Sequence, residues 1–383
     1  MKATHLFKAF FSSEKAGGLI LIACTVVSLL LANNSFGGGY HEFWQMKFSG
    51  QSLEHWINDG LMTIFFLLIG LELEREIYDG ELSNIKDAAL PFFGALGGML
   101  VPAILYLLVN YGSATQSGAG ITMATDIAFA LGILSLLGNR VPTSLKIFLT
   151  ALAVIDDLGA ILLIAVFYSK NIVVANLLIS LGIFAALLLM NRLKVRNLIP
   201  YLLGGVGMWY FMLHSGVHAT ITGVLLAFAI PFGNGSKTSS SYLLQKALHK
   251  PVAFFILPVF ALANTAIFIS PGIGKALTQT YSMGIAIGLV IGKPLGIFLG
   301  SFIAVRLGIC KLPADMSWRS IIGVGFLGGI GFTMSIFIAL LAFDDMSIIN
   351  VAKFAILLSS VVAGVVGFVL LKNILKLKVP EDD

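Results

Sequence analysis

The sequence predicts an all-α integral membrane protein with about twelve transmembrane helices. Of its 383 residues, 58% are hydrophobic and only 11% are charged, whereas soluble domains carry about 25% charged residues. Apolar runs recur along the whole chain, and many reach the roughly 18 to 20 helical residues that cross a hydrocarbon core about 30 Å thick. We therefore expect a single transmembrane domain over residues 1–383 and no soluble domain.

The apolar runs also place the helices along the chain. We expect helices, with ends correct to within a few residues, at 12–31, 55–76, 88–109, 115–138, 143–169, 172–191, 198–213, 216–231, 251–269, 282–304, 318–343 and 349–374. The longest polar connections, 33–54 and 232–250, are too short to form domains, and the first should hold a short periplasmic hairpin. Residues 1–13 precede an apolar segment without a small-residue cleavage site, which indicates a retained helix and not a signal peptide.

The basic residues predict the orientation, because Lys and Arg are retained on the cytoplasmic side. Of the 24 Lys and Arg, one lies within a span and four fall on the side opposite the N-terminus, which leaves nineteen on the N-terminal side. The one within a span is Lys293, and the four on the opposite side are Lys47, Lys170, Lys275 and Lys353. We therefore expect both termini in the cytoplasm. The net charge of +5 then reflects loops facing anionic lipid headgroups, and no nucleic-acid partner is expected.

Four ionisable residues lie near the middle of expected spans, namely Asp126, Asp156, Asp157 and Lys293. An ionised side chain at the bilayer centre costs roughly 2.5 to 3.5 kcal/mol on insertion scales, so it is retained where a partner, cavity or ion pathway offsets that cost. A salt bridge that only joins helices is the alternative. One Lys cannot neutralise three Asp, which favours a functional site.

The adjacent pair Asp156-Asp157 predicts the chemistry of this site. Neighbouring helical residues point about 100° apart, so one carboxylate can face a helix partner while the other faces an ion. Burial and like charge both favour protonation, and the two groups titrate jointly. A proton and a hard cation would therefore compete for the same oxygens. Oxygen ligands suit Na⁺ or Li⁺, and no His/Cys cluster indicates a zinc site or another cofactor.

Two spans are predicted to be broken at mid-depth. Thr125 and Asp126 precede an apolar run as helix N-caps do, although they lie inside a span. A carboxylate there would stabilise the exposed amides and the positive end of the second half-helix. The glycines of residues 328–331 suggest a second break near 329, with close helix packing as the alternative. Broken spans at matching positions in two halves of a chain indicate a transporter's binding site.

Lys293 is followed by Pro294, which disturbs the local helix. Its ammonium can pair with Asp156 or offset the negative ends of half-helices. Two roles remain open: a second proton carrier that is released when the cation takes its carboxylate partner, or a structural counter-ion.

Two other classes of membrane protein were weighed. A sodium-coupled symporter of a small organic anion can use broken helices, but it needs further polar groups around a larger cavity. A membrane enzyme needs a nucleophile with its base, or a metal site, and no such cluster lies at depth. We therefore expect a transporter and not an enzyme.

Five sequence runs resemble the motifs of the NhaA-type sodium/proton antiporter family. They are residues 124–132, 151–159, 215–220, 291–296 and 329–337, and the similarity extends over almost the whole chain. The resemblance implies inverted three-helix repeats at about 88–169 and 282–374, with discontinuous helices crossing near 125 and 329 and the other helices forming the dimer interface part. It also implies a bacterial inner-membrane homodimer, joined partly by the hairpin. Its activity would be electrogenic exchange of two protons for one Na⁺ or Li⁺ by alternating access, which exports sodium and controls cytoplasmic pH.

The same resemblance assigns roles to residues. Asp157 would be the main carrier of Na⁺ and H⁺, and Asp156 would join it or pair with Lys293. Thr125 and Asp126 would support the broken centre. Activation at alkaline pH would involve the residues Glu72, Arg75, Glu76 and His249, although that charged stretch also fits a solvated helix end. Strongly pH-regulated members carry an acidic residue and a histidine where this chain has Gln245-Lys246. His218 is a further candidate pH switch, with a packing histidine as the alternative.

Overall fold

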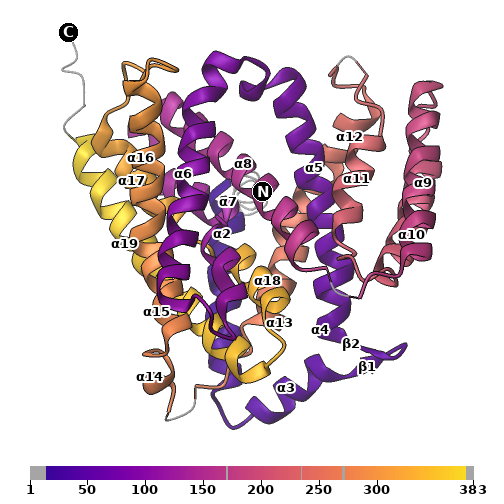
Figure 1. The fold of residues 1–383 in the computed structure, drawn as a ribbon, viewed down its shortest axis with the longest axis horizontal. Coiled ribbons are helices and arrows are strands. Elements are labelled where there is room, and N and C mark those ends of the chain that lie inside the picture. Colours follow the sequence, from indigo (N-terminus) through magenta and orange to yellow (C-terminus); the bar gives the residue numbers. More distant parts are fainter. Residues whose placement is uncertain (1–13, 170, 234, 270–271, 377–383) are drawn as a thin grey trace, which may run out of the picture. The chain divides into compact units, whose positions relative to one another are not determined.

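A computed structural model describes residues 14–169, 171–233, 235–269 and 272–376. The chain divides into two compact units. Unit 1 comprises the described residues of Met1–Ser35, Asn84–Ala160 and Asn264–Asp383, and unit 2 comprises those of Phe36–Ser83 and Ile161–Ala263. Each unit is built almost entirely of helices (Figure 1).

Unit 1 contains both breaks that the sequence predicts. Its helices are α2 (Glu14–Ala32), α6 (Ile85–Asn110), α7 (Ile127–Leu136), α8 (Thr143–Phe167, which runs on into unit 2), α14 (Ile273–Ala276), α15 (Thr280–Ile287), α16 (Lys293–Arg306), α17 (Trp318–Gly328), α18 (Phe332–Ala342) and α19 (Met346–Lys376). Short 3₁₀-helices cover Gln116–Thr122 and Gly138–Arg140, and a π-helical turn covers Gly288–Gly292. The half-helices α17 and α18 meet at an angle of 50°.

Unit 2 contains the hairpin and the remaining helices. The helices are α3 (Gly37–Gln45), α4 (Leu53–Trp56), α5 (Met62–Asp79), α9 (Val174–Arg192), α10 (Leu198–Leu213), α11 (Ile221–Ala229), α12 (Ser240–Pro251) and α13 (Leu257–Asn264), with π-helical turns at Ile57–Leu61 and Val252–Ile256 and a short three-residue-per-turn helix at Glu81–Ser83. Strands β1 (Lys47–Phe48) and β2 (Gln51–Ser52) pair antiparallel. Ser49 and Gly50 form the turn with positive φ angles of 52° and 87°, as tight hairpins require.

The described residues include eight helices that are long and apolar enough to cross a membrane, or up to ten if each sharply bent pair counts as one span. The prediction of an all-α membrane protein is therefore confirmed. Several ends agree closely with the sequence prediction, for example 198–213 for α10 and 143–169 for α8. Helix length and apolar composition define these spans, and both are readable from sequence.

The sequence prediction was wrong in three local features. Residues 240–250, expected in a loop, belong to α12, whose polar face hid it from a search for apolar runs. The span expected at 216–231 contains only the nine-residue helix α11. Lys353, counted with the basic residues on the side opposite the N-terminus, lies inside α19 with 3% of its surface exposed, and its ammonium donates a hydrogen bond to Asn264 Oδ1 at 3.3 Å.

Glycines allow two helix pairs to pack at backbone distance. A Cβ added to Gly97 of α6 would lie 2.1 Å from the carbonyl oxygen of Gly296 in α16, and one added to Gly300 would lie 2.0 Å from that of Phe93. In unit 2, a Cβ on Gly223 of α11 would lie 2.2 Å from the Thr63 carbonyl oxygen of α5. Small residues at helix contacts are typical of membrane proteins, where close van der Waals packing drives helix association.

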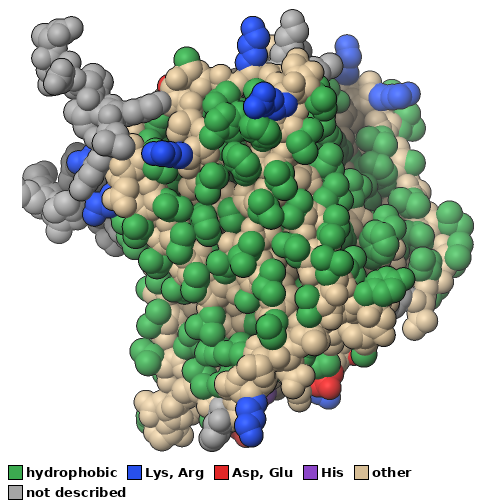
Figure 2. Space-filling model, turned by 60° about the vertical axis from the view of Figure 1, so that its left-hand side comes forward, with side chains coloured by type: hydrophobic (Ala, Val, Ile, Leu, Met, Phe, Trp, Pro, Cys, Tyr) green, Lys and Arg blue, Asp and Glu red, His purple; other side chains and the backbone are tan. Residues whose placement is uncertain are grey.

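The outer faces of several helices are apolar and exposed. On α6 the exposed residues recur every four positions, at Phe92, Leu96, Leu100, Ile104 and Leu108. Figure 2 shows a broad hydrophobic face with Lys and Arg side chains at its edges. Such a surface is unfavourable in water and favourable against lipid chains.

Candidate ion-exchange site

The centre of the candidate site is an ion pair with no exposed surface on either side chain. Lys293 Nζ lies 2.5 Å from Asp156 Oδ2, and each side chain is 0% exposed. Asp156 comes from the middle of α8, and Lys293 begins α16. The second oxygen, Asp156 Oδ1, is buried without a hydrogen-bond partner among the described residues. This oxygen retains the capacity to accept a proton or a cation.

Local backbone structure positions Lys293. The π-helical turn Gly288–Gly292 ends directly before it, and Pro294 follows. Proline has no N–H to donate, so the regular hydrogen-bond ladder is interrupted at this point, and π-turns are common at functional sites. The helix disturbance that the sequence predicted beside Pro294 is therefore present.

Thr125 links Asp156 to the broken span. Its Oγ1 lies 2.7 Å from Asp156 Oδ2 and 2.8 Å from the carbonyl oxygen of Gly328, the last residue of α17. A hydroxyl has one hydrogen, so Thr125 donates to one of these two acceptors at a time. Neutralising Asp156 would weaken the first bond and favour the second. The charge of Asp156 is thus coupled to the end of α17.

Asp126 joins the N-terminal ends of two half-helices. As the N-cap of α7, its Oδ1 accepts a hydrogen bond from Phe129 N at 2.9 Å. Its Oδ2 accepts from both the backbone N (3.1 Å) and the hydroxyl of Thr333, in the first turn of α18. Its own N–H donates to the carbonyl of Ile330 at 2.7 Å. One carboxylate therefore satisfies amides and positive dipole ends at both breaks.

Asp157 follows Asp156 on α8 and is 1% exposed. Three ionised carboxylates, Asp126, Asp156 and Asp157, would exceed the two buried ammoniums among the described residues of unit 1, Lys293 and Lys353, by one negative charge. Among the described residues no three His, Cys, Asp or Glu side chains form a metal-binding group, so the three acids are not one ligand cluster. Asp126 serves the helix ends, whereas Asp156 and Asp157 are neighbours on α8 and are both buried.

Comparison of the sequence with known proteins places this chain in a family. Residues 8–371 match the family model described as Na⁺/H⁺ antiporter 1. The chain belongs to this Na⁺/H⁺ antiporter family. It is 71% identical over 376 residues to a protein of Flavobacterium psychrophilum named Na(+)/H(+) antiporter NhaA, covering 98% of both chains. It is 63% identical to proteins named NhaA 1 in Flavobacterium johnsoniae (98% of both chains) and NhaA in Cytophaga hutchinsonii (98% of this chain and 97% of the relative).

The candidate pH-response residues of this Na⁺/H⁺ antiporter family member form contacts between α5 and α12. Glu72 Oε1 lies 3.7 Å from His249 Nδ1. Arg75 donates from Nε to Gln245 Oε1 at 2.8 Å, and its guanidinium lies 4.5 Å from the ring centre of Tyr242. Glu76 is half-buried on the same helix.

A buried acid beside this group was not singled out from the sequence. Glu74 is 4% exposed, and its Oε2 accepts a hydrogen bond from Ser241 of α12 at 3.2 Å. The sequence shows only four charged residues among residues 72–76, which does not reveal which of them points inward. The partner, 167 positions away, lies on the helix that the sequence prediction missed.

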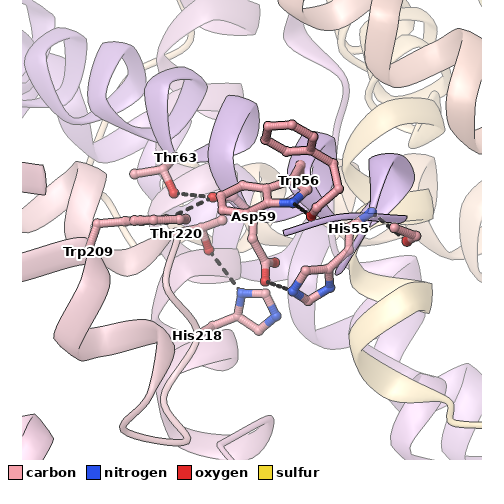
Figure 3. Close-up of polar contacts among 9 residues, drawn as sticks. His55, Trp56, Asp59, Thr63, Trp209, His218 and Thr220 are labelled. Carbon is pink, nitrogen blue, oxygen red and sulfur yellow. Dashed lines mark hydrogen bonds and ion pairs between the residues drawn. The ribbon is translucent and has the colours of Figure 1, made fainter. Parts of the chain in front are cut away.

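His218 lies apart from that group, in the loop between α10 and α11. Figure 3 shows its ring beside Asp59 and His55. His55 Nε2 lies 3.2 Å from Asp59 Oδ2, and His218 Nδ1 lies 3.3 Å from Thr220 Oγ1. Burial lowers the pKa of His218 below its usual value, while the charge of Asp59 raises it and that of His55 lowers it.

The two groups lie at opposite ends of one segment. Asp59 is thirteen residues before Glu72 in the continuous helical stretch Leu53–Asp79, which corresponds to roughly 20 Å at 1.5 Å per residue. The structure therefore does not bring His218 together with the other candidate pH-response residues. Asp59 was not predicted as a site residue, although an acid next to an apolar run was a signal available in the sequence.

Proposed function

We propose that this chain exchanges Na⁺ for H⁺ across a membrane at the Asp156-Asp157 pair by alternating access. Its membership of a Na⁺/H⁺ antiporter family makes it a transporter and not an enzyme. The observation that carries the assignment of the site is the fully buried Lys293–Asp156 ion pair adjacent in sequence to the buried Asp157. Na⁺ and H⁺ are the transported ions, and we include Li⁺ because oxygen ligands suit it equally.

Competition between the two cations follows from the cost of burying charge. An ionised Asp157 in the bilayer is unfavourable, whereas either a proton or a Na⁺ neutralises it. With the site open to the cytoplasm, Na⁺ displaces protons from the pair. The neutralised unit then tilts relative to the rest of the protein, releases Na⁺ on the other side, and returns with protons. The unit does not move while its site is empty and charged.

The ion pair also offers a source for a second proton. When Na⁺ takes the Asp156 carboxylate, Lys293 loses its buried counter-ion, and an unpaired ammonium at depth is strongly disfavoured. Release of a proton from the Lys293 ammonium, together with one from Asp157, gives electrogenic exchange of two protons for one Na⁺.

We further propose the full architecture that the sequence predicts: twelve spans, inverted repeats at 88–169 and 282–374, and helices crossing near 125 and 329. Contacts between the two breaks and the make-up of unit 1 support the proposal. Asp126 caps α7 and also accepts hydrogen bonds from Thr333 near the start of α18, and Ser335 donates to the Ile121 carbonyl at 2.6 Å. Most residues of both repeats fall in unit 1. We also propose cytoplasmic termini in a bacterial inner membrane, and a homodimer joined partly through the β1–β2 hairpin.

The α5–α12 contacts are proposed to set the response to pH. His249 and Glu72 face each other across this contact, and Arg75 and Glu76 contribute further charge on α5. Because Gln245 is neutral, we expect a less steep dependence on pH than in members with a carboxylate there.

Transport in proteoliposomes tests the proposed function. Vesicles that contain the purified protein and an internal pH dye should change their internal pH when Na⁺ alone is added. Asp157→Asn should abolish this response, while Asp344→Asn, in the exposed connection between α18 and α19, should retain it. Exchange at the normal rate by Asp157→Asn would reject the site. A response that needs an added organic anion would indicate a symporter.

A further inference from the structure

A cavity of about 300 Å³ lies in unit 1, between the end of α7 and the last turns of α19. Its lining residues are Leu136, Leu137, Arg140, Phe368, Lys372 and Leu375. None of them belongs to the ion-exchange site. The cavity combines four apolar side chains with two cations and has no acidic residue in its lining.

The two cations give the cavity a charge of +2 that the described residues do not neutralise. Lys372 Nζ lies 5.9 Å from the ring centre of Phe368. Among the described carboxylates, none lies within ion-pair distance of Arg140 or Lys372. An anionic group between them would form charge-assisted hydrogen bonds, and the Arg guanidinium suits phosphate oxygens in particular.

The surface beside the cavity is apolar and exposed. On α19 the exposed residues Val361, Val365 and Val369 follow one another at four-residue spacing, and Lys372 comes three positions later. Leu136, at the end of α7, is 49% exposed. The cations therefore lie where an apolar stripe of α19 ends, at the place where the headgroup of a lipid would lie if its chains followed the stripe.

We propose that this cavity binds an anionic phospholipid. The phosphate lies between Arg140 and Lys372, and an acyl chain follows the stripe Val361, Val365 and Val369. The distribution of basic residues predicts both cations on the cytoplasmic side, where anionic lipids are enriched and where basic pockets between helices bind their headgroups. The site does not depend on the proposed ion exchange, because it requires only that the chain spans a bilayer.

The bound lipid would act on the helices that carry the broken centre. Helix α7 begins directly after Asp126 and ends at the cavity, a length of ten residues. An anion that bridges Arg140 and Lys372 holds the end of α7 against α19. We therefore expect the lipid to stabilise the protein, and salt to weaken this effect through screening.

Thermal unfolding in a neutral detergent tests the proposal. Phosphatidylglycerol should raise the melting temperature more than phosphatidylcholine with the same acyl chains. The double variant Arg140→Gln/Lys372→Gln should lose this difference and bind phosphatidylglycerol at least ten-fold more weakly by native mass spectrometry. The control Lys275→Gln/Lys311→Gln removes two exposed cations outside the cavity and should behave like the unmodified protein.

Three outcomes would overturn the proposal. The first is that the double variant keeps the full effect of phosphatidylglycerol, and the second is that the two lipids stabilise the protein equally. The third is that inorganic phosphate stabilises as much as phosphatidylglycerol, which would indicate a site for a free anion. Because both cations are exposed, we expect the double variant to melt like the unmodified protein without lipid. If that variant does not fold, Arg140→Lys/Lys372→Arg, which keeps both charges, must retain the lipid effect.

Discussion

Lys293 Nζ contacts Asp156 Oδ2 at 2.5 Å, with both side chains fully buried. Replacing one partner leaves the other charge buried without compensation, at a cost of about 3 to 5 kcal/mol. Lys293→Gln and Asp156→Asn should each lower the melting temperature, and the double variant should recover most of the loss. The four proteins form a double-mutant cycle that isolates the coupling. Purely additive losses would contradict a direct interaction between the two groups.

Thr333→Val should destabilise the broken centre while it preserves the shape of the side chain. The variant removes the hydroxyl donor to Asp126 Oδ2 and leaves the backbone donors Phe129 N and Thr333 N in place. Loss of one buried partner costs about 1 to 3 kcal/mol. Thr150→Val is the matched control, because that hydroxyl bonds only within its own helix, to the Lys146 carbonyl. Equal melting temperatures for the two variants would reject the predicted importance of the contact.

His218 should titrate below the usual histidine pKa of about 6.5, because burial lowers its pKa. The unfolded chain then binds more protons than the folded one, so stability falls as pH drops from about 6.5 toward the folded pKa. Asp59→Asn should lower the pKa of His218 further, and His55→Gln should raise it. NMR of labelled histidines measures the pKa of His218 in the unmodified protein and in each of the two variants. If the pKa of His218 rose in Asp59→Asn and fell in His55→Gln, these two neighbours would not control it.

Gln245→Glu should stabilise the contact between α5 and α12 at neutral pH. Arg75 now donates to a neutral amide oxygen, and a carboxylate would make this bond charge-assisted, although a partly exposed pair contributes only about 0 to 1 kcal/mol. The gain should vanish below about pH 4, where a glutamate is protonated, and the transport rate should depend more steeply on pH. Gln51→Glu, in the β2 strand, is a control of equal charge change. A gain that persists in acid would exclude an ionic origin.

The sequence predicted the residues whose charge is energetically unfavourable inside a lipid bilayer. Asp156 and Lys293 stood out because a charge at mid-span requires a reason, and the structure pairs them. Most span limits followed from length and apolar composition. Both signals are local, so they can be read without knowledge of the fold.

Contacts between residues far apart in the chain could not be predicted from local features of the sequence. Thr333 lies 207 positions from Asp126 and is one hydroxyl among many. Helix α12 is amphipathic and was assigned to a loop, so the partners of Arg75 and Glu74 were missed with it. Lys353 lies near the start of α19, where sequence cannot distinguish a loop lysine from a buried one.

Proton release on Na⁺ binding tests the central claim most directly. Calorimetric titration of the purified protein with NaCl, in buffers of different ionisation enthalpy, gives the number of protons released for each Na⁺ bound. Because Na⁺ and H⁺ occupy the same acid pair, we predict release approaching two protons at a pH where the site is protonated, and none from Asp157→Asn. Binding of Na⁺ to the unmodified protein without proton release would contradict the account.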